Sequence, residues 1–132
     1  MIGGRGVHVL VVDDNEGIRD TTAAILRSVG YTVTEAKDGD LALEELAQKP
    51  FDVVVLDDRM PKLNGTELVR TLCPVPPPPV IMMASALDFD LDFWQSLGQR
   101  VFKYLQKPIP PKLLIEAVGE ALDSRRDRDR DA

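Results

Sequence analysis

The stretch VVVLDDRMP, residues 53–61, is an apolar run that stops at two adjacent carboxylates. A short run of this kind, rich in β-branched residues, is typical of a strand that is buried on both faces. Residues 7–15, VHVLVVDDN, repeat the pattern, because a second apolar run ends at Asp13 and Asp14. The carboxyl ends of parallel strands meet at one edge of a sheet, which is where α/β proteins place their functional residues.

Strand patterns alternate with helix patterns along the rest of the chain. Apolar or alternating runs predict five strands, at residues 7–12, 31–36, 51–57, 80–84 and 101–105. Helical spacing predicts helices at 15–29 and 41–46, a short helix after Asn64 and Gly65, and a last helix from Pro111 with Leu114, Val118 and Leu122 on its buried face. This order predicts an α/β fold: a doubly wound, five-stranded parallel sheet in a (βα)5 single domain.

Composition limits the class of protein. The chain has 132 residues, which suits one domain, and its net charge of −6 argues against a direct nucleic-acid contact. The single cysteine, Cys73, favours a reducing compartment, so we expect a cytoplasmic protein. The sequence contains no apolar run of the length that spans a bilayer, and we expect no membrane contact.

Charged and hydroxyl side chains follow the expected strands at the same edge of the sheet. They are Asp13 and Asp14, then Asp57 and Asp58, then Ser85, then Lys107. Neighbouring carboxylates repel one another, and helix capping explains Asp14 alone. Mg²⁺ (or Mn²⁺) would resolve the repulsion and leave room for a phosphate oxygen, while the lysine would offset added negative charge. Because the sequence has no glycine-rich nucleotide loop, we expect a phosphoryl group that comes from another molecule and is accepted by a carboxylate.

The two acids of VVVLDDRMP have different expected roles. Side chains alternate along a strand, so Asp57 and Asp58 face opposite ways. Asp57 shares its parity with Val53 and Val55 and ends the strand, where it can meet Asp13 and the other charged groups. Asp58 belongs to the loop, and we expect it to be a solvated or helix-capping acid.

Four motifs, in order, resemble the receiver domain of two-component response regulators. They are VLVVDDN at 9–15, VVVLDDRMPKLNG at 53–65, MASA at 83–86 and YLQKP at 104–108. The resemblance runs from about residue 7 to residue 122 and implies a flavodoxin-like topology. It leaves an N-terminal extension at 1–6 and a charged C-terminal tail at 123–132.

The resemblance implies a phosphoacceptor and a metal site. Asp57 matches the acceptor aspartate, which precedes x-x-Met-Pro. Asp13 and Asp14 match the acidic pair that holds Mg²⁺, and Asp57 and the backbone carbonyl of Arg59 would complete the protein ligands. Arg59 and Leu87 match positions that border the path of attacking water, so we expect them to tune the lifetime of the acyl phosphate.

The resemblance also implies switch residues. Ser85 matches the hydroxyl that turns toward the phosphoryl group, with Ala84 as the alternative alignment. Tyr104 matches the aromatic residue that changes rotamer with it. Lys107 matches the lysine that pairs with the phosphate, and its peptide bond to Pro108 is expected to be cis.

The implied function is a signalling switch in bacteria. Asp57 would accept a phosphoryl group from a phosphohistidine of a sensor histidine kinase or of a histidine phosphotransfer protein. The expected chemistry is self-phosphorylation and autodephosphorylation rather than turnover of a small substrate. We expect a stand-alone receiver in a phosphorelay or similar pathway, with the excised N-terminal domain of a longer regulator or hybrid kinase as the alternative.

The segment LDFDLDFW, residues 87–94, is the candidate output surface. On a helix its apolar residues would occupy two faces, which usually requires a covering partner. We expect Phe89, Phe93 and Trp94, with Tyr104, to bind a downstream protein or a second copy of the domain. The alternative is an irregular loop with its aromatic residues tucked in.

Other functional classes remain open. A small phosphohydrolase would use Asp13 as nucleophile and a second acid two residues on, where this chain has Asn15. A flavin-binding protein would have a phosphate loop after the first strand, and the acidic DDNEG disfavours it. A receiver-like module that signals without phosphate typically loses one of the acids or the lysine, and this chain keeps them all.

Overall fold

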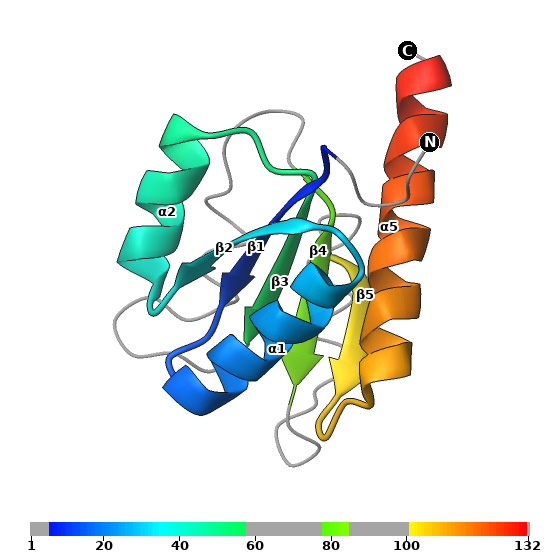
Figure 1. Cartoon of the computed structure of the whole chain (residues 1–132). Coiled ribbons are helices and arrows are strands. Elements are labelled where there is room, and N and C mark those ends of the chain that lie inside the picture. The colour runs from blue at the N-terminus through cyan, green and yellow to red at the C-terminus, as the bar shows by residue number, and fades with distance from the viewer. Residues whose placement is uncertain (1–5, 58–77, 85–100, 132) are drawn as a thin grey trace.

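The computed structural model describes residues 6–57, 78–84 and 101–131 (Figure 1). Its strands are β1 (His8–Val12), β2 (Thr32–Ala36), β3 (Val53–Asp57), β4 (Val80–Ala84) and β5 (Val101–Gln106). Its helices are α1 (Glu16–Ser28), α2 (Gly39–Gln48) and α5 (Pro111–Asp131). The five expected strands and these three helices are confirmed, with ends that differ by a few residues. The helices expected after residue 64 and around residues 87–94 lie outside the described residues.

The strands form one parallel sheet in the order β2-β1-β3-β4-β5, as the α/β pattern predicts. The chain moves from β1 outward to β2, then returns to place β3 on the other side of β1. The strand order therefore reverses between β1 and β3, and ligands in such sheets bind at the carboxyl ends beside this reversal. The carboxyl ends of β1 and β3 lead to Asp13 and Asp57, so the topology brings the two acids to the switch point.

Local signals set the limits of the helices. The Asn15 side chain caps α1 by accepting the Ile18 N–H at 2.9 Å, and Asp38 caps α2 by accepting the Leu41 N–H at 2.9 Å. Gly30 follows α1 with a φ of 98°, a left-handed conformation that a residue without a Cβ adopts at low cost. Pro111 opens α5, where its missing N–H leaves no hydrogen bond unmade.

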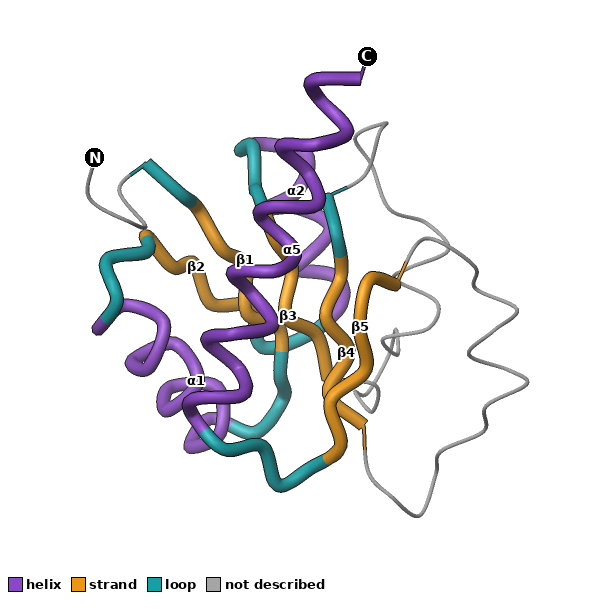
Figure 2. The backbone as a smooth tube through the Cα atoms, turned by 90° about the vertical axis from the view of Figure 1, so that its right-hand side faces the viewer, coloured by secondary structure: helices purple, strands orange, loops and turns teal. Residues whose placement is uncertain are grey.

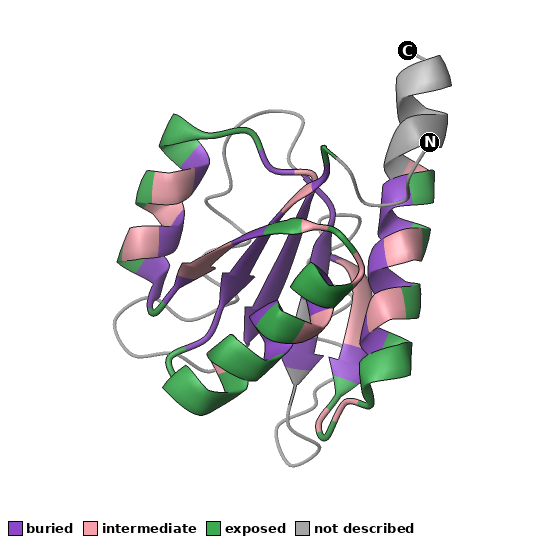
Figure 3. Cartoon of the chain, viewed as in Figure 1, coloured by how far each residue is buried: buried purple, intermediate pink, exposed green. Residues whose placement is uncertain are grey.

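The sheet is covered on both faces. Leu10, Val12, Val54 and Leu56 point to the side of α2, whereas the alternate residues of the same strands point to the side of α1 and α5. Helices α1 and α5 lie beside each other, and α2 lies across the sheet from them (Figures 1 and 2). The central strands are buried while the outer faces of the helices are exposed (Figure 3). Because β1 and β3 are apolar on both faces, their relative position is fixed by the core.

Strand β5 departs from simple alternation. Val80 of β4 pairs with Val101, but Ile81 pairs with Lys103, so one residue of β5 is extra at this point. Such a bulge shifts the parity of every later side chain. Val101 and Tyr104 therefore pack against the core on the α2 side, and Leu105 belongs to the core under α1 and α5. In the described part of the chain, no helix has the length and apolar character needed to cross a membrane.

Leu26 tests the core beneath α1, because its side chain is fully buried. We expect Leu26→Ala to lower the free energy of unfolding by about 2–5 kcal/mol, since it removes buried methyl groups and leaves a cavity. Ile18→Ala is the matched control on the same helix, where the side chain is 42% exposed, and it should cost far less. Urea denaturation followed by circular dichroism measures both changes; similar losses in the two variants would contradict the assigned core.

Candidate functional site

The site lies at the carboxyl ends of β1 and β3. Asp57 is the last residue of β3 and is 3% exposed, and Asp13 directly follows β1 and is fully buried. Asp14 is exposed beside them. The alternation of β3 places Asp57 on the same side as Val53 and Val55, as the sequence pattern predicts.

The three acids form a group that suits a cation. Each of Asp13, Asp14 and Asp57 has a carboxylate oxygen that lies within 4.8 Å of the others. Asp13 Oδ1 accepts the backbone N–H of Asn15 at 2.9 Å. Asp13 Oδ2 is buried and has no hydrogen-bond partner among the described residues. A buried carboxylate oxygen that lacks a donor, together with oxygen-only ligands, fits a hard divalent cation such as Mg²⁺.

Lys107 reaches the site from the loop after β5. Its Nζ lies 2.8 Å from Asp57 Oδ1, where it forms both a hydrogen bond and an ion pair. The Lys107 side chain is 30% exposed, whereas that of Asp57 is only 5% exposed. The Lys107–Pro108 peptide bond is cis, as the resemblance implies. The structure thus brings together four of the expected site residues: Asp13, Asp14, Asp57 and Lys107.

The environment of Asp13 disfavours its charged form. Burial is the main cause and raises the pKa of Asp13 to about 6 from an ordinary value of 3.8. The negative charges of Asp57 and Asp14 raise the pKa further, whereas the Asn15 N–H and the positive charge of Lys107 lower it. Without a cation, the site therefore holds this proton more tightly than an exposed aspartate does.

Other expected site residues are only partly covered by the structure. Tyr104 is on β5, half-buried, and packs against the core on the α2 side. The remaining ones lie outside the described residues: Asp58, Arg59, Ser85, Leu87, Phe89, Phe93 and Trp94.

An apolar groove beside Lys107 is a feature that sequence reasoning missed. It has a volume of about 700 Å³ and runs between the start of α1 and the loop from β5 to α5. Lys107 lines the groove together with Ile18, Ile25, Met83, Pro108 and Ile109. The exposed Ile18 in the first turns of the amphipathic α1 was its one sequence signal.

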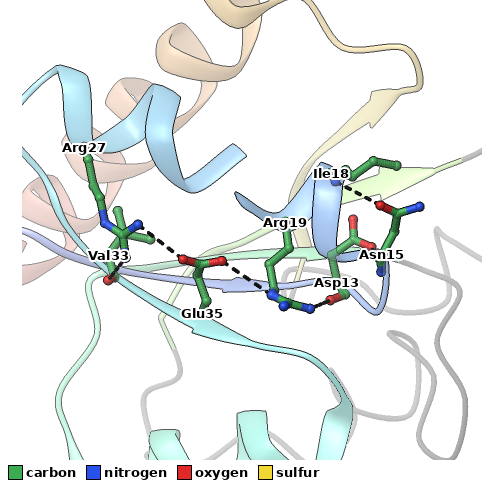
Figure 4. A network of polar contacts seen from close by, with 7 residues as sticks. All are labelled: Asp13, Asn15, Ile18, Arg19, Arg27, Val33 and Glu35. Carbon is green, nitrogen blue, oxygen red and sulfur yellow. Dashed lines mark hydrogen bonds and ion pairs between the residues drawn. The ribbon is translucent and has the colours of Figure 1, made fainter. Parts of the chain in front are cut away.

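A network of charged residues behind Asp13 was also missed (Figure 4). Arg19 Nη1 donates to the backbone carbonyl of Asp13 at 3.0 Å, and Arg19 Nε lies 3.4 Å from Glu35 Oε1. The other Glu35 oxygen lies 3.2 Å from Arg27 Nη1, and Arg27 Nη2 donates to the carbonyl of Val33 at 2.9 Å. These contacts join α1 to β2, so the sequence alone does not indicate the pairing.

Comparison with known proteins identifies the family. Residues 9–119 match the family model described as the response regulator receiver domain. The chain belongs to the response regulator receiver domain family. This family supplies receiver domains to two-component systems, and the match confirms the resemblance seen in the four motifs.

Relatives and solved structures agree with this assignment. The chain is 34% identical over 123 residues to the sensory transduction protein RegX3 of Mycolicibacterium smegmatis, covering 93% of this chain and 53% of that protein. It is 31% identical over 116 residues to the transcriptional regulatory protein GlrR of Escherichia coli, covering 88% of this chain and 26% of that protein. A CheY-like receiver domain protein of Methanospirillum hungatei matches with a TM-score of 0.83 and 29% identity, covering 92% and 98% of the two chains.

This receiver domain therefore spans about half of the length of RegX3 and about a quarter of the length of GlrR. Receiver domains in general bind Mg²⁺ at an acidic pocket and interact with kinases and downstream effectors. The cluster of Asp13, Asp14 and Asp57 is an acidic pocket of that kind.

Removing the Asp13 charge should stabilise the domain when divalent cations are absent. The pKa is higher in the folded state, so the folded chain binds more protons than the unfolded chain between about pH 4 and 6, and stability falls as the pH rises through that window. The full shift corresponds to about 3 kcal/mol, and screening by solvent at the open edge reduces it, so we expect Asp13→Asn to gain about 1–2 kcal/mol at neutral pH.

Urea denaturation in a chelating buffer measures this gain, which should disappear near pH 4. Asp14→Asn is the matched control, because Asp14 is exposed and its charge is solvated. An equal gain in both variants, or a gain that persists at low pH, would contradict the burial cost assigned to Asp13.

Proposed function

We propose that the domain accepts a phosphoryl group on Asp57 and thereby switches a protein-interaction surface. The observation that supports this most is the position of Asp57: it is buried at the switch point, beside two further acids, with Lys107 on one of its oxygens. A carboxylate in this setting is a nucleophile that is shielded from solvent. Lys107 already lies beside it and can balance the negative charge of the phosphorylated product.

The proposed reaction takes the phosphoryl group from a phosphohistidine on a sensor kinase or a histidine phosphotransfer protein. An oxygen of Asp57 attacks the phosphorus atom in line, so that a P–O bond forms while the P–N bond breaks and the histidine nitrogen keeps the electron pair. Mg²⁺ held by Asp13, Asp14 and Asp57, with the carbonyl of Arg59, would offset the negative charge of the transferred group. Lys107, whose Nζ lies 2.8 Å from Asp57 Oδ1, adds a second positive charge beside the acceptor.

Hydrolysis of the acyl phosphate would return the domain to its resting state. Arg59 and Leu87 lie two residues after Asp57 and Ser85 in the sequence, and we propose that their side chains set the rate of this hydrolysis. The phosphoryl group would draw in Ser85, and Tyr104 would follow it. This movement would change the surface formed by β5, α5 and the fourth helix of the (βα)5 pattern, which is expected around residues 87–94. Residues 87–94 belong to that surface in this proposal and would contact the downstream partner. We assign the receiver fold to residues 7–122.

The groove beside Lys107 offers a docking surface for the phosphodonor. Asp57 is almost inaccessible to solvent, whereas Lys107, which contacts it, is partly exposed, so we place the approach of the donor along the edge that carries Lys107. The groove opens there and presents apolar side chains, among them the exposed Ile18. An amphipathic helix that carries the phosphohistidine could bury its apolar face on these side chains while the histidine reaches Asp57.

Phosphorylation of Asp57 is tested by intact mass. Incubation with Mg²⁺ and acetyl phosphate should add one phosphoryl group to the parent protein. The addition should be lost in Asp57→Asn, which removes the nucleophile, and retained in Asp58→Asn, the adjacent acid that strand alternation is expected to turn away from the site. No addition in the parent protein would favour the alternative in which the domain is an interaction module that works without phosphate.

Docking in the groove is tested by comparing two phosphodonors. We expect Ile18→Glu to slow phosphotransfer from a histidine kinase or phosphotransfer protein by about 10-fold or more, because a charge replaces an apolar contact of the interface. The same variant should react with acetyl phosphate at the parent rate, since a small donor does not need the groove. Transfer from protein can be followed by loss of label from the phosphorylated donor, and unchanged transfer would place the docking surface elsewhere.

A further inference from the structure

The carbonyl of Asp13 lies at the point where the β1 ladder ends. The backbone N–H of Asp13 still donates to the carbonyl of Ala36 on β2, at 3.1 Å. The carbonyl oxygen of the same residue instead accepts a hydrogen bond from the side chain of Arg19. A buried carbonyl without a donor is costly, so Arg19 satisfies a group that the sheet leaves open.

Arg19 and Asn15 hold Asp13 from two directions. The backbone N–H of Asn15 fixes the Oδ1 atom of Asp13, and Arg19 fixes its carbonyl oxygen (Figure 4). With these two bonds in place, the Oδ2 atom remains unpaired among the described residues. These two hydrogen bonds therefore leave Oδ2 as the Asp13 carboxylate oxygen that is available to a cation.

An ion pair with Glu35 holds the Arg19 side chain in place. This side chain is 14% exposed, and its Nε pairs with Glu35, whose other oxygen is bound by Arg27. Glu35 is on β2, so the ion pair ties the guanidinium to the sheet rather than to solvent. The Glu35 carboxylate also offsets part of the Arg19 charge, and so reduces the repulsion between Arg19 and a cation bound nearby.

We infer that Arg19 is a positioning residue for the metal site, and that it raises Mg²⁺ affinity by fixing Asp13. This inference rests on the proposed function, in which Asp13 is a metal ligand. Arg19 contacts neither the acceptor nor the expected ion, so it acts through the backbone of Asp13. Groups that orient ligands in this way commonly contribute about 10–100-fold to metal affinity.

The direction in which Mg²⁺ affinity changes when Arg19 is removed distinguishes a positioning role from a purely electrostatic one. Arg19 carries a positive charge, so if it acted only through that charge, its removal would tighten Mg²⁺ binding. If it positions Asp13, its removal would weaken binding in spite of the lost repulsion. We expect Arg19→Gln to weaken Mg²⁺ binding by about 10-fold, at the lower end of the range for such orienting groups.

The experiment is calorimetric titration of the whole chain with Mg²⁺, above the pKa of Asp13 and at fixed ionic strength. Arg27→Gln is the matched control, because it breaks the contacts to Glu35 and Val33 and leaves the Arg19 bond to Asp13 in place. It should change affinity much less than Arg19→Gln. Arg19→Lys keeps a donor and the charge, and it should recover part of the lost affinity. Circular dichroism and urea denaturation in a chelating buffer establish that each variant is folded.

Each outcome is decisive. Unchanged or tighter Mg²⁺ binding in a folded Arg19→Gln overturns the inference, as does an equal loss in Arg27→Gln, which would assign the effect to general stability. A parent protein that binds no Mg²⁺ would instead overturn the proposed metal site. A loss confined to Arg19→Gln, with partial recovery in Arg19→Lys, supports the positioning role.

Discussion

The structure depends on the close approach of two buried carboxylates, Asp13 and Asp57. The apolar cores on both faces of β1 and β3 hold these strands side by side, so the acids that end them cannot move apart. Burial and like charge both disfavour ionisation, and the raised pKa of Asp13 expresses this cost. The buried apolar residues of the sheet offset the cost, which is why such a site lies at the end of a fully covered sheet rather than on a surface loop.

Among the described residues, three groups help to compensate the two acids. Lys107 supplies charge to Asp57, the Asn15 N–H supplies a hydrogen bond to Asp13, and Arg19 binds the Asp13 backbone. None of these reaches Asp13 Oδ2, so the protein alone leaves the cluster incompletely satisfied within the described residues. The proposed cation completes it. The incompletely satisfied carboxylates therefore lower the stability of the resting domain and, for the same reason, favour the binding of a metal ion.

Sequence reasoning predicted the parts of this arrangement that depend on short-range order. Apolar runs located the strands, and alternation along β3 placed Asp57 toward the other charged groups. The structure adds two local features: Asn15 and Asp38 each accept a hydrogen bond from the first turn of a helix. Parallel topology then brought Asp13, Asp57 and Lys107 to one edge without further information.

The features that sequence reasoning missed depend on distances between elements. Alternation from Val101 would place Leu105 on the same face, but the extra residue in β5 reverses that parity, and no residue type signals it. The pairing of Arg19 with Glu35 requires the angle at which α1 crosses β2, and the groove requires the spacing between α1 and the loop before α5. Charged residues on a helix and on a strand have many possible partners, and only tertiary packing selects one.

The contact between Lys107 and Asp57 limits how the proposed switch can work. This ion pair already exists in the structure, so phosphorylation would change the partner atom of Lys107 rather than create its first contact with the acceptor. Lys107 would thus have an anionic partner in both states, and only the difference between those two ion pairs can shift the equilibrium between them. Lys107 is therefore better suited to stabilise negative charge during phosphoryl transfer than to drive the conformational change that follows phosphorylation. The conformational change would then depend on groups that contact the acceptor only through the phosphoryl oxygens. In this proposal the first such group is Ser85, and Tyr104 responds to Ser85.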